Sequence, residues 1–122
     1  MRIFKYSLFD KWAKKHGLTD SQLKQAILEI ERGLIDANLG GNVYKKRIGK
    51  QGQGKSGAYR TILLMRVSDT VIFAHGFTKG EKDNISKSDL DGFKIMAGAF
   101  LNLTSEQLTT LIANQNLIEI EQ

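Results

Sequence analysis

Two apolar segments joined by a short polar turn are the feature that most constrains the fold of this chain. Residues 59–67 and 71–77 are rich in β-branched and aromatic side chains, while Ser68, Asp69 and Thr70 between them favour a turn. The pattern predicts an antiparallel β-hairpin. If residue 67 pairs with 70, or 68 with 71, the numbers of paired residues sum to an odd number.

This register determines which side chains share a face of the hairpin. It places Arg60, Ile62, Leu64 and Arg66 beside Phe77, His75, Phe73 and Val71, in that order. Arg60, His75 and Lys79 then converge at the open end of the hairpin, next to a glycine-rich segment at 49–57. We therefore expect a polar site at that end.

The segments around the hairpin indicate an α+β fold. Residues 2–6 have a strand-like pattern, and two amphipathic helices joined at 16–18 predict an N-terminal helical hairpin. Capping-box spacings at Ser88 and Thr104 predict two C-terminal helices, and 117–120 is suited to an edge strand. We expect a small, mostly antiparallel sheet with the helices on one face.

Length and composition exclude several classes of protein. A chain of 122 residues is the size of one domain, 1–122. Because it has no Cys, disulfide scaffolds and thiolate metal sites are excluded, and a cytoplasmic location is favoured. Two His residues are too few for a zinc site without carboxylates. No apolar run is long enough to cross a membrane, so we expect no membrane association. We also expect no metal and no small-molecule cofactor.

Positive charge is concentrated in the middle of the chain. Residues 37–68 contain seven basic side chains and no acidic one, whereas 69–122 contain four basic and eight acidic residues. Along 43–48 the side chains alternate, so that Lys45 and Arg47 share one face of a strand and Lys46 lies on the other. This segment is either a solvated face or a phosphate-binding surface.

The glycine-rich segment formally matches a phosphate-binding loop. Gly49, Gly54, Lys55 and Ser56 have the required spacing. The residues that follow are strand-like, however, and such a loop needs a helix N-terminus behind the phosphates. Nucleotide hydrolysis is therefore disfavoured.

Three motifs resemble a known family. They are GQGKSGAYRTI at 52–62, FTKGEKDNI at 77–85 and LIDANLGG at 34–41. The chain resembles the RelE/ParE toxin superfamily, and within it the RelE/HigB-like branch of type II toxin–antitoxin systems. The resemblance implies a microbial ribonuclease-like (RelE) fold, cleavage of mRNA at the ribosome and neutralisation by a cognate antitoxin.

RNA cleavage through the 2′-hydroxyl needs a base, an acid and cations that stabilise the phosphorane. Arg60 is the candidate for phosphate stabilisation, with Lys55 and Lys79 nearby, and His75 is the candidate for proton transfer, or else a structural strand residue. The candidates for binding the RNA backbone are Lys45, Lys46, Arg47, Lys50 and Lys82. No metal is required if these cations supply the charge.

The chain departs from the family pattern at two positions. A second arginine and a tyrosine of the best-studied sites fall on Gly80 and Ser86 here, which leaves the general acid and base unassigned. A ParE-like toxin that binds a protein target such as DNA gyrase, and a catalytically degenerate member, are therefore alternatives. The apolar character of both faces of the hairpin predicts a surface that helices on one side leave open for an antitoxin.

Overall fold

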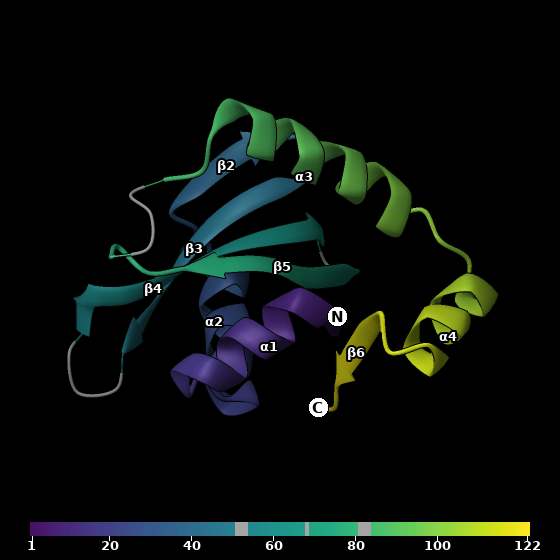
Figure 1. Cartoon of the computed structure of the whole chain (residues 1–122), viewed down its shortest axis with the longest axis horizontal. Helices are drawn as coiled ribbons and strands as arrows, with labels where there is room; N and C mark the ends of the chain where they lie inside the picture. Colours follow the sequence, from purple (N-terminus) through teal and green to yellow (C-terminus); the bar gives the residue numbers. More distant parts are fainter. Residues whose placement is uncertain (51–53, 68, 81–83) are drawn as a thin grey trace.

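A computed structural model describes residues 1–50, 54–67, 69–80 and 84–122, and Figure 1 shows its elements. In chain order they are β1 (Arg2–Tyr6), α1 (Ser7–His16), α2 (Asp20–Glu31), β2 (Ala37–Gly40), β3 (Val43–Lys50), β4 (Gly54–Arg66), β5 (Thr70–Phe77), α3 (Lys87–Phe100), α4 (Ser105–Ala113) and β6 (Leu117–Ile120).

The strands form one six-stranded mixed sheet in the order β2-β3-β4-β5-β1-β6. Four neighbouring pairs are antiparallel, while β1 runs parallel to β5. The first strand of the chain therefore lies inside the sheet, where Ile3, Phe4 and Lys5 are all buried. Consecutive buried side chains are typical of a strand covered on both faces.

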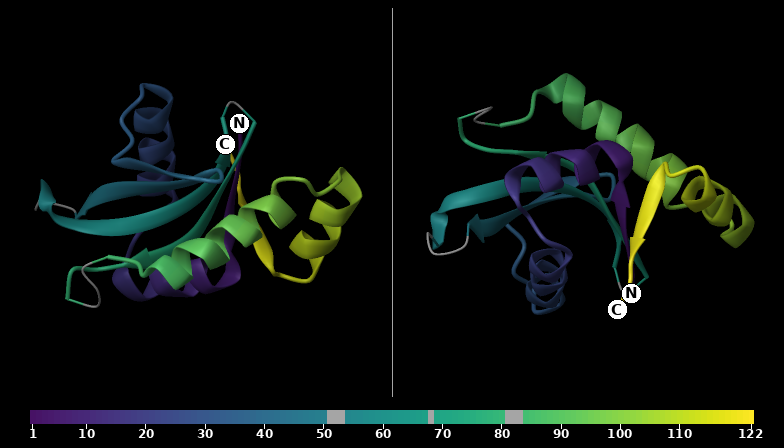
Figure 2. Two further views of the ribbon diagram at one scale, coloured as in Figure 1. Left: turned by 90° about the horizontal axis from the view of Figure 1, so that it is seen from above. Right: turned by 60° about the horizontal axis from the view of Figure 1, so that its bottom comes forward.

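Helices cover both faces of the sheet (Figure 2). Phe9 and Ala13 of α1 and Leu23 and Ile27 of α2 pack in one core with Phe73. The core on the opposite face is formed by α3 and α4 together with strand residues that include Phe4, Val43, Ile62, Leu64 and Ile72. The cause is the apolar character of β4 and β5 on both sides, since each face must be covered to bury it.

The structure is α+β, but the predicted arrangement within that class is wrong. The sheet is mixed, the helices lie on two faces, and the N-terminal helical hairpin is not seen because the chain begins with a strand. The two helices after β1 share one core but lie on different strands, α1 on β5 and β1 and α2 on β3, and Figure 2 shows their axes crossing. Because α3 and α4 cover the second face, it is not the open surface that the sequence predicted.

The β4–β5 hairpin is present, with a register that changes along its length. Near the turn Arg66 pairs with Thr70 and Leu64 with Ile72, so the odd-sum prediction is wrong there. A β-bulge opposite Ile62 and Leu63, with Ala74 of β5 as the extra residue, shifts the register by one residue. Beyond it Ile62 pairs with His75 and Arg60 with Phe77, as predicted.

Most helices begin and end at the capping residues that the sequence predicts. Capping boxes at Thr19 and Thr104 open α2 and α4, and Gly17 takes a left-handed conformation with φ of 71° at the end of α1. The α3 capping box is at Ser86 rather than Ser88. Both serines have an aspartate three residues later, so spacing alone does not separate them.

An ionic cluster centred on the buried Lys5 and Asp10 connects β1 to the two helices after it. Lys5 Nζ donates to Asp10 Oδ1 at 2.7 Å and to Asp20 Oδ1 at 2.8 Å, and Lys14 lies 3.0 Å from the other Asp10 oxygen. Burial acts to raise the pKa of Asp10, but the hydrogen bonds from Lys5 and Lys14 outweigh it and hold that pKa below its usual range.

Candidate functional site

Two cross-strand rows carry polar side chains on the same face of the sheet as α3. In the first row Arg47 of β3 pairs with Arg60 of β4, which pairs with Phe77 of β5. In the second row Lys45, Ile62 and His75 occupy the corresponding places. We call Arg47, Arg60, Lys45 and His75 the basic rows. The next row on this face pairs Val43 with Leu64, and α3 and α4 help to bury both side chains.

A hollow of about 270 Å³ opens beside three of these side chains, and it is lined by Asp36, Lys45, Arg47 and Arg60. Three cations and one carboxylate leave it with net positive charge. The Arg47 side chain is 49% exposed, while Lys45 and Arg60 are partly buried. An anion entering from solvent therefore meets three positively charged groups at once.

Asp36 orients one of these cations. Its Oδ2 accepts a hydrogen bond from the Arg47 backbone N–H at 2.6 Å, and its Oδ1 lies 3.2 Å from Arg47 Nε. The carboxylate thus binds both the backbone and the side chain of Arg47, which restricts the orientation of its guanidinium beside Arg60. Sequence reasoning missed Asp36. The signal for it is the Gly40-Gly41-Asn42 turn, because a hairpin there pairs Ala37 with Lys45 and brings the preceding aspartate to Arg47.

Aromatic rings border the second row. The His75 ring centroid lies 5.8 Å from that of Phe77 and 5.5 Å from that of Phe93 on α3. The imidazole is partly buried between the sheet and the helix, so packing restricts its orientation.

The loop before α3 joins the site at Asn84. Lys45 Nζ lies 3.5 Å from Asn84 Oδ1, which also accepts a hydrogen bond from the Ile85 N–H at 2.9 Å. Two turns into α3, the Lys94 stem lies over Gly41 in the β2–β3 turn, so that a Cβ added at Gly41 would meet it at 2.8 Å. The helix is thereby fixed against the hairpin that carries Arg47.

Among the other predicted residues, Lys46 and Lys79 do not join the basic rows. Lys46 points to the opposite face, where its Nζ donates to Glu29 Oε1 on α2 at 2.6 Å and its side chain is 4% exposed. Lys79 is exposed in the turn after β5. Lys50 and Lys55 belong to β3 and β4 at the end of their hairpin, which extends beyond the helices in Figure 1. Lys82 lies outside the described residues.

The two positions that depart from the family pattern have other roles in the part of the chain that the structure describes. Gly80 is exposed in the turn after β5. Ser86 is the N-cap of α3, and its hydroxyl accepts a hydrogen bond from the Asp89 N–H at 3.0 Å. A capping hydroxyl serves the helix end, so Ser86 does not replace a catalytic tyrosine.

The described residues contain neither a metal-binding cluster nor a membrane-spanning helix. No group of three His, Cys, Asp or Glu side chains among them is placed to hold a metal ion. Within the same residues, every helix is too short or too polar to cross a membrane.

Comparison with known proteins identifies the family. No curated protein matches the chain. The family described as "RelE toxin of RelE / RelB toxin-antitoxin system" matches residues 1–120, which is nearly the whole sequence. The match confirms the resemblance that the three motifs indicate and supports a toxin role with a cognate antitoxin as partner. The chain belongs to the RelE toxin family of toxin–antitoxin systems.

Proposed function

We propose that this toxin is a metal-independent endoribonuclease that cleaves mRNA at the ribosome, in the cytoplasm, and that its antitoxin neutralises it. The observation that carries the proposal is the direct cross-strand pairing of Arg47 with Arg60. Like charges placed opposite each other on a sheet are destabilising, and a phosphate between two guanidinium groups relieves this repulsion. Asp36 offsets part of the repulsion at Arg47, and the net positive charge that remains suits the pair to a bound phosphodiester.

The chemistry assigns a role to each residue of the basic rows. The 2′-hydroxyl attacks the adjacent phosphorus, the bond to the 5′-oxygen breaks, and the products are a 2′,3′-cyclic phosphate and a 5′-hydroxyl. Arg60 and Arg47 stabilise the charge on the phosphorane oxygens, and Lys45 holds the neighbouring phosphate. His75 is the proton-transfer candidate, because a ring nitrogen of imidazole can accept or donate the proton.

The peripheral lysines complete the proposal. Lys79, Lys55 and Lys50 flank the basic rows in sequence, and Lys82 follows in the β5–α3 loop, so we assign them to the path of the RNA backbone. Lys46 has no place in this path because Glu29 holds it on the other face of the sheet.

Arg60→Ala tests the proposal, with Arg66→Ala as its control. Arg66 belongs to the same strand, but it lies beside the turn and contacts Asp69 and Asn102. In a reconstituted translation reaction, we expect wild type and Arg66→Ala to cut mRNA and Arg60→Ala to lose about 10²–10³-fold in rate. Intact mRNA with the wild-type chain contradicts the proposal, and topoisomerase-linked DNA breaks in its place indicate the ParE-like alternative.

His75→Gln separates catalysis from packing. If His75 transfers a proton, cleavage falls by about 10²–10⁴-fold while the unfolding midpoint changes little. If its role is only to pack on Phe93, the midpoint falls and cleavage by the folded fraction is unchanged.

A further inference from the structure

Asn84 lies where the chain has crossed back over the sheet after β5. That strand ends at Phe77, in the same cross-strand row as Arg60, and by Asn84 the chain has reached Lys45 on β3, with β4 between the two strands. Asn84 is exposed, beside the hollow that Lys45 lines. It therefore stands at the border of the cationic site that we assign to RNA.

Two donors determine the orientation of the Asn84 amide. Its Oδ1 accepts a hydrogen bond from the Ile85 N–H at 2.9 Å and lies 3.5 Å from Lys45 Nζ. The reverse orientation would place the Nδ2 hydrogens against the hydrogens of both donors. The oxygen therefore faces the protein, and Nδ2 points away from it. In the part of the chain that the structure describes, no group accepts a hydrogen bond from Nδ2.

A second asparagine that contacts a cation uses both ends of its amide within the protein. Asn102 Oδ1 accepts from Arg66 Nη2 at 2.9 Å, and Asn102 Nδ2 donates to the Gly98 carbonyl at 2.7 Å. The whole amide of Asn102 therefore stabilises the end of α3. Asn84 differs because only its oxygen bonds to the described protein, which leaves a pre-oriented donor next to a lysine.

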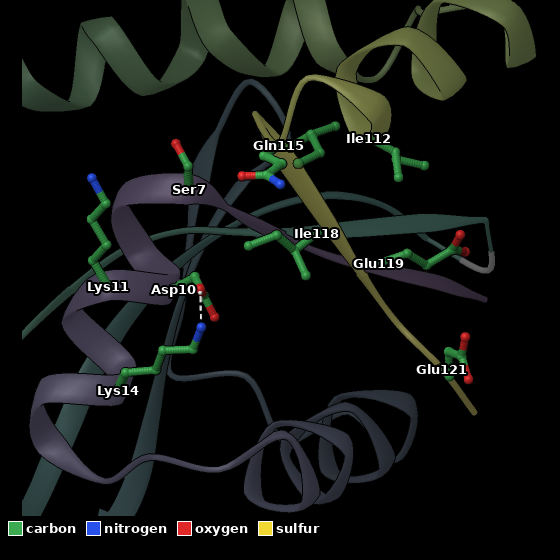
Figure 3. A pocket seen from close by; sticks show the side chains of 10 residues that line it. Ser7, Asp10, Lys11, Lys14, Ile112, Gln115, Ile118, Glu119 and Glu121 are labelled. Atoms are coloured by element: carbon green, nitrogen blue, oxygen red, sulfur yellow. Dashed lines mark ion pairs between the residues drawn. The ribbon is translucent and has the colours of Figure 1, made fainter.

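The partner of Lys45 also differs from that of Lys14 on α1. Lys14 Nζ lies 3.0 Å from a carboxylate oxygen of Asp10, and Figure 3 shows this pair as a dashed line in a hollow of about 660 Å³. That hollow is lined by two lysines and three carboxylates, so its charges cancel. An amide orients an ammonium without neutralising it. Lys45 therefore keeps its full charge for an anion from solvent.

We propose that Asn84 Nδ2 donates a hydrogen bond to a non-bridging oxygen of the phosphate that Lys45 holds, so that Asn84 is an RNA-binding residue. This inference rests on the proposed function, since the anion is the RNA backbone beside the phosphate at Arg47 and Arg60. A phosphate offers several acceptors at one point, and asparagine is among its usual donors. A base edge fits less well, because the amide oxygen that would accept from a base already faces the protein.

Asn84→Ala tests the contact, with Asn102→Ala as its matched control. Loss of a hydrogen bond to a charged group weakens binding about 10–100-fold, so we expect this loss for Asn84→Ala on a 2′-O-methylated RNA. Asn102→Ala should bind that RNA like the wild type. The slope of log K against log salt should not change in Asn84→Ala, because the lost group is neutral. The unfolding midpoint of each chain, measured in urea, establishes that folded proteins are compared.

A Lys45→Met chain separates a direct contact from positioning. If Asn84 only holds Lys45 in place, Asn84→Ala lowers the salt slope by about 0.7, as loss of the lysine does, and has no effect in the Lys45→Met chain. If Asn84 contacts the phosphate, the same change weakens binding in the Lys45→Met chain by about threefold or more. The positioning result overturns the proposal, and so does wild-type affinity in Asn84→Ala.

Cleavage by the wild-type chain in the translation reaction keeps this inference apart from the proposed function. A chain that binds the methylated RNA through Asn84 but leaves mRNA intact supports the contact and contradicts the nuclease. A chain that cuts mRNA, and whose affinity for RNA is unchanged by Asn84→Ala, overturns the contact and leaves the nuclease standing.

Discussion

Lys45 and Lys46 are neighbours in sequence but lie on opposite faces of the sheet. The same substitution should therefore weaken RNA binding at Lys45 and lower the stability of the fold at Lys46. Lys46→Met removes a cation that pairs with Glu29, and Lys45→Met removes a cation of the hollow. Breaking a buried ion pair costs about 3–5 kcal/mol. Because the Glu29 side chain is 23% exposed and can be hydrated again, we expect Lys46→Met to lose about 2–3 kcal/mol of unfolding free energy. For Lys45→Met, as for other surface substitutions, we expect a change within about 0.5 kcal/mol.

Urea denaturation and RNA binding measure the two effects separately. With a slope of about 1.5 kcal/mol per molar urea, the midpoint of Lys46→Met falls by about 1.3–2 M. Binding to a 2′-O-methylated RNA, which cannot be cleaved, should keep its salt dependence in folded Lys46→Met. In Lys45→Met one phosphate contact is lost, so the slope of log K against log salt falls by about 0.7. Loss of RNA binding in Lys46→Met without loss of stability would refute this assignment of the two faces.

Three further predictions concern positioning, pH and packing. Asp36→Asn releases the Arg47 guanidinium, so kcat should fall about tenfold while KM for RNA, measured in the translation reaction, does not rise, since a negative charge has been removed. The pKa of Asp10 is lowered by folding, so its contribution is present above pH about 3.9 and is lost as pH falls through the folded-state pKa; acid titration should show a smaller loss of stability in Asp10→Asn than in wild type. Gly76→Ala places a Cβ against the Trp12 ring and should cost about 1–3 kcal/mol, measured by urea denaturation.

Features encoded by adjacent residues could be predicted from the sequence. The β4–β5 hairpin and the capping boxes at Thr19 and Thr104 depend on side chains within a few positions of each other. The place of β1 in the sheet depends on β5 and β6, which are far away in the sequence. In the sequence of β1 only Ile3 and Phe4 indicate burial on both faces, because Lys5 interrupts the apolar run, and no local pattern identifies the neighbouring strands.

The candidate site could be predicted only as far as strand alternation allows. Alternation separates Lys46 from Lys45 and Arg47, but it does not say which face a helix will cover. That depends on α2, whose Glu29 reaches Lys46 from 17 residues away in the sequence. Grouping the three as one RNA-binding set ignored this difference.

His75 shares a face with Arg60 because of the β-bulge, and the sequence prediction reached the same pairing by a different route. It assumed one odd-sum register from the turn outward, whereas the register at the turn is even-sum. If that even-sum register continued, Ile62 would pair with Ala74, and His75 would point to the face covered by α1 and α2. The structure has an extra residue on β5, so that Ala74 packs in the core under α3 and the next residue, His75, contacts Phe93 on the same face. Bulges re-aim side chains next to functional sites, and this one places the only imidazole of the sheet in line with Lys45 and beside Arg60.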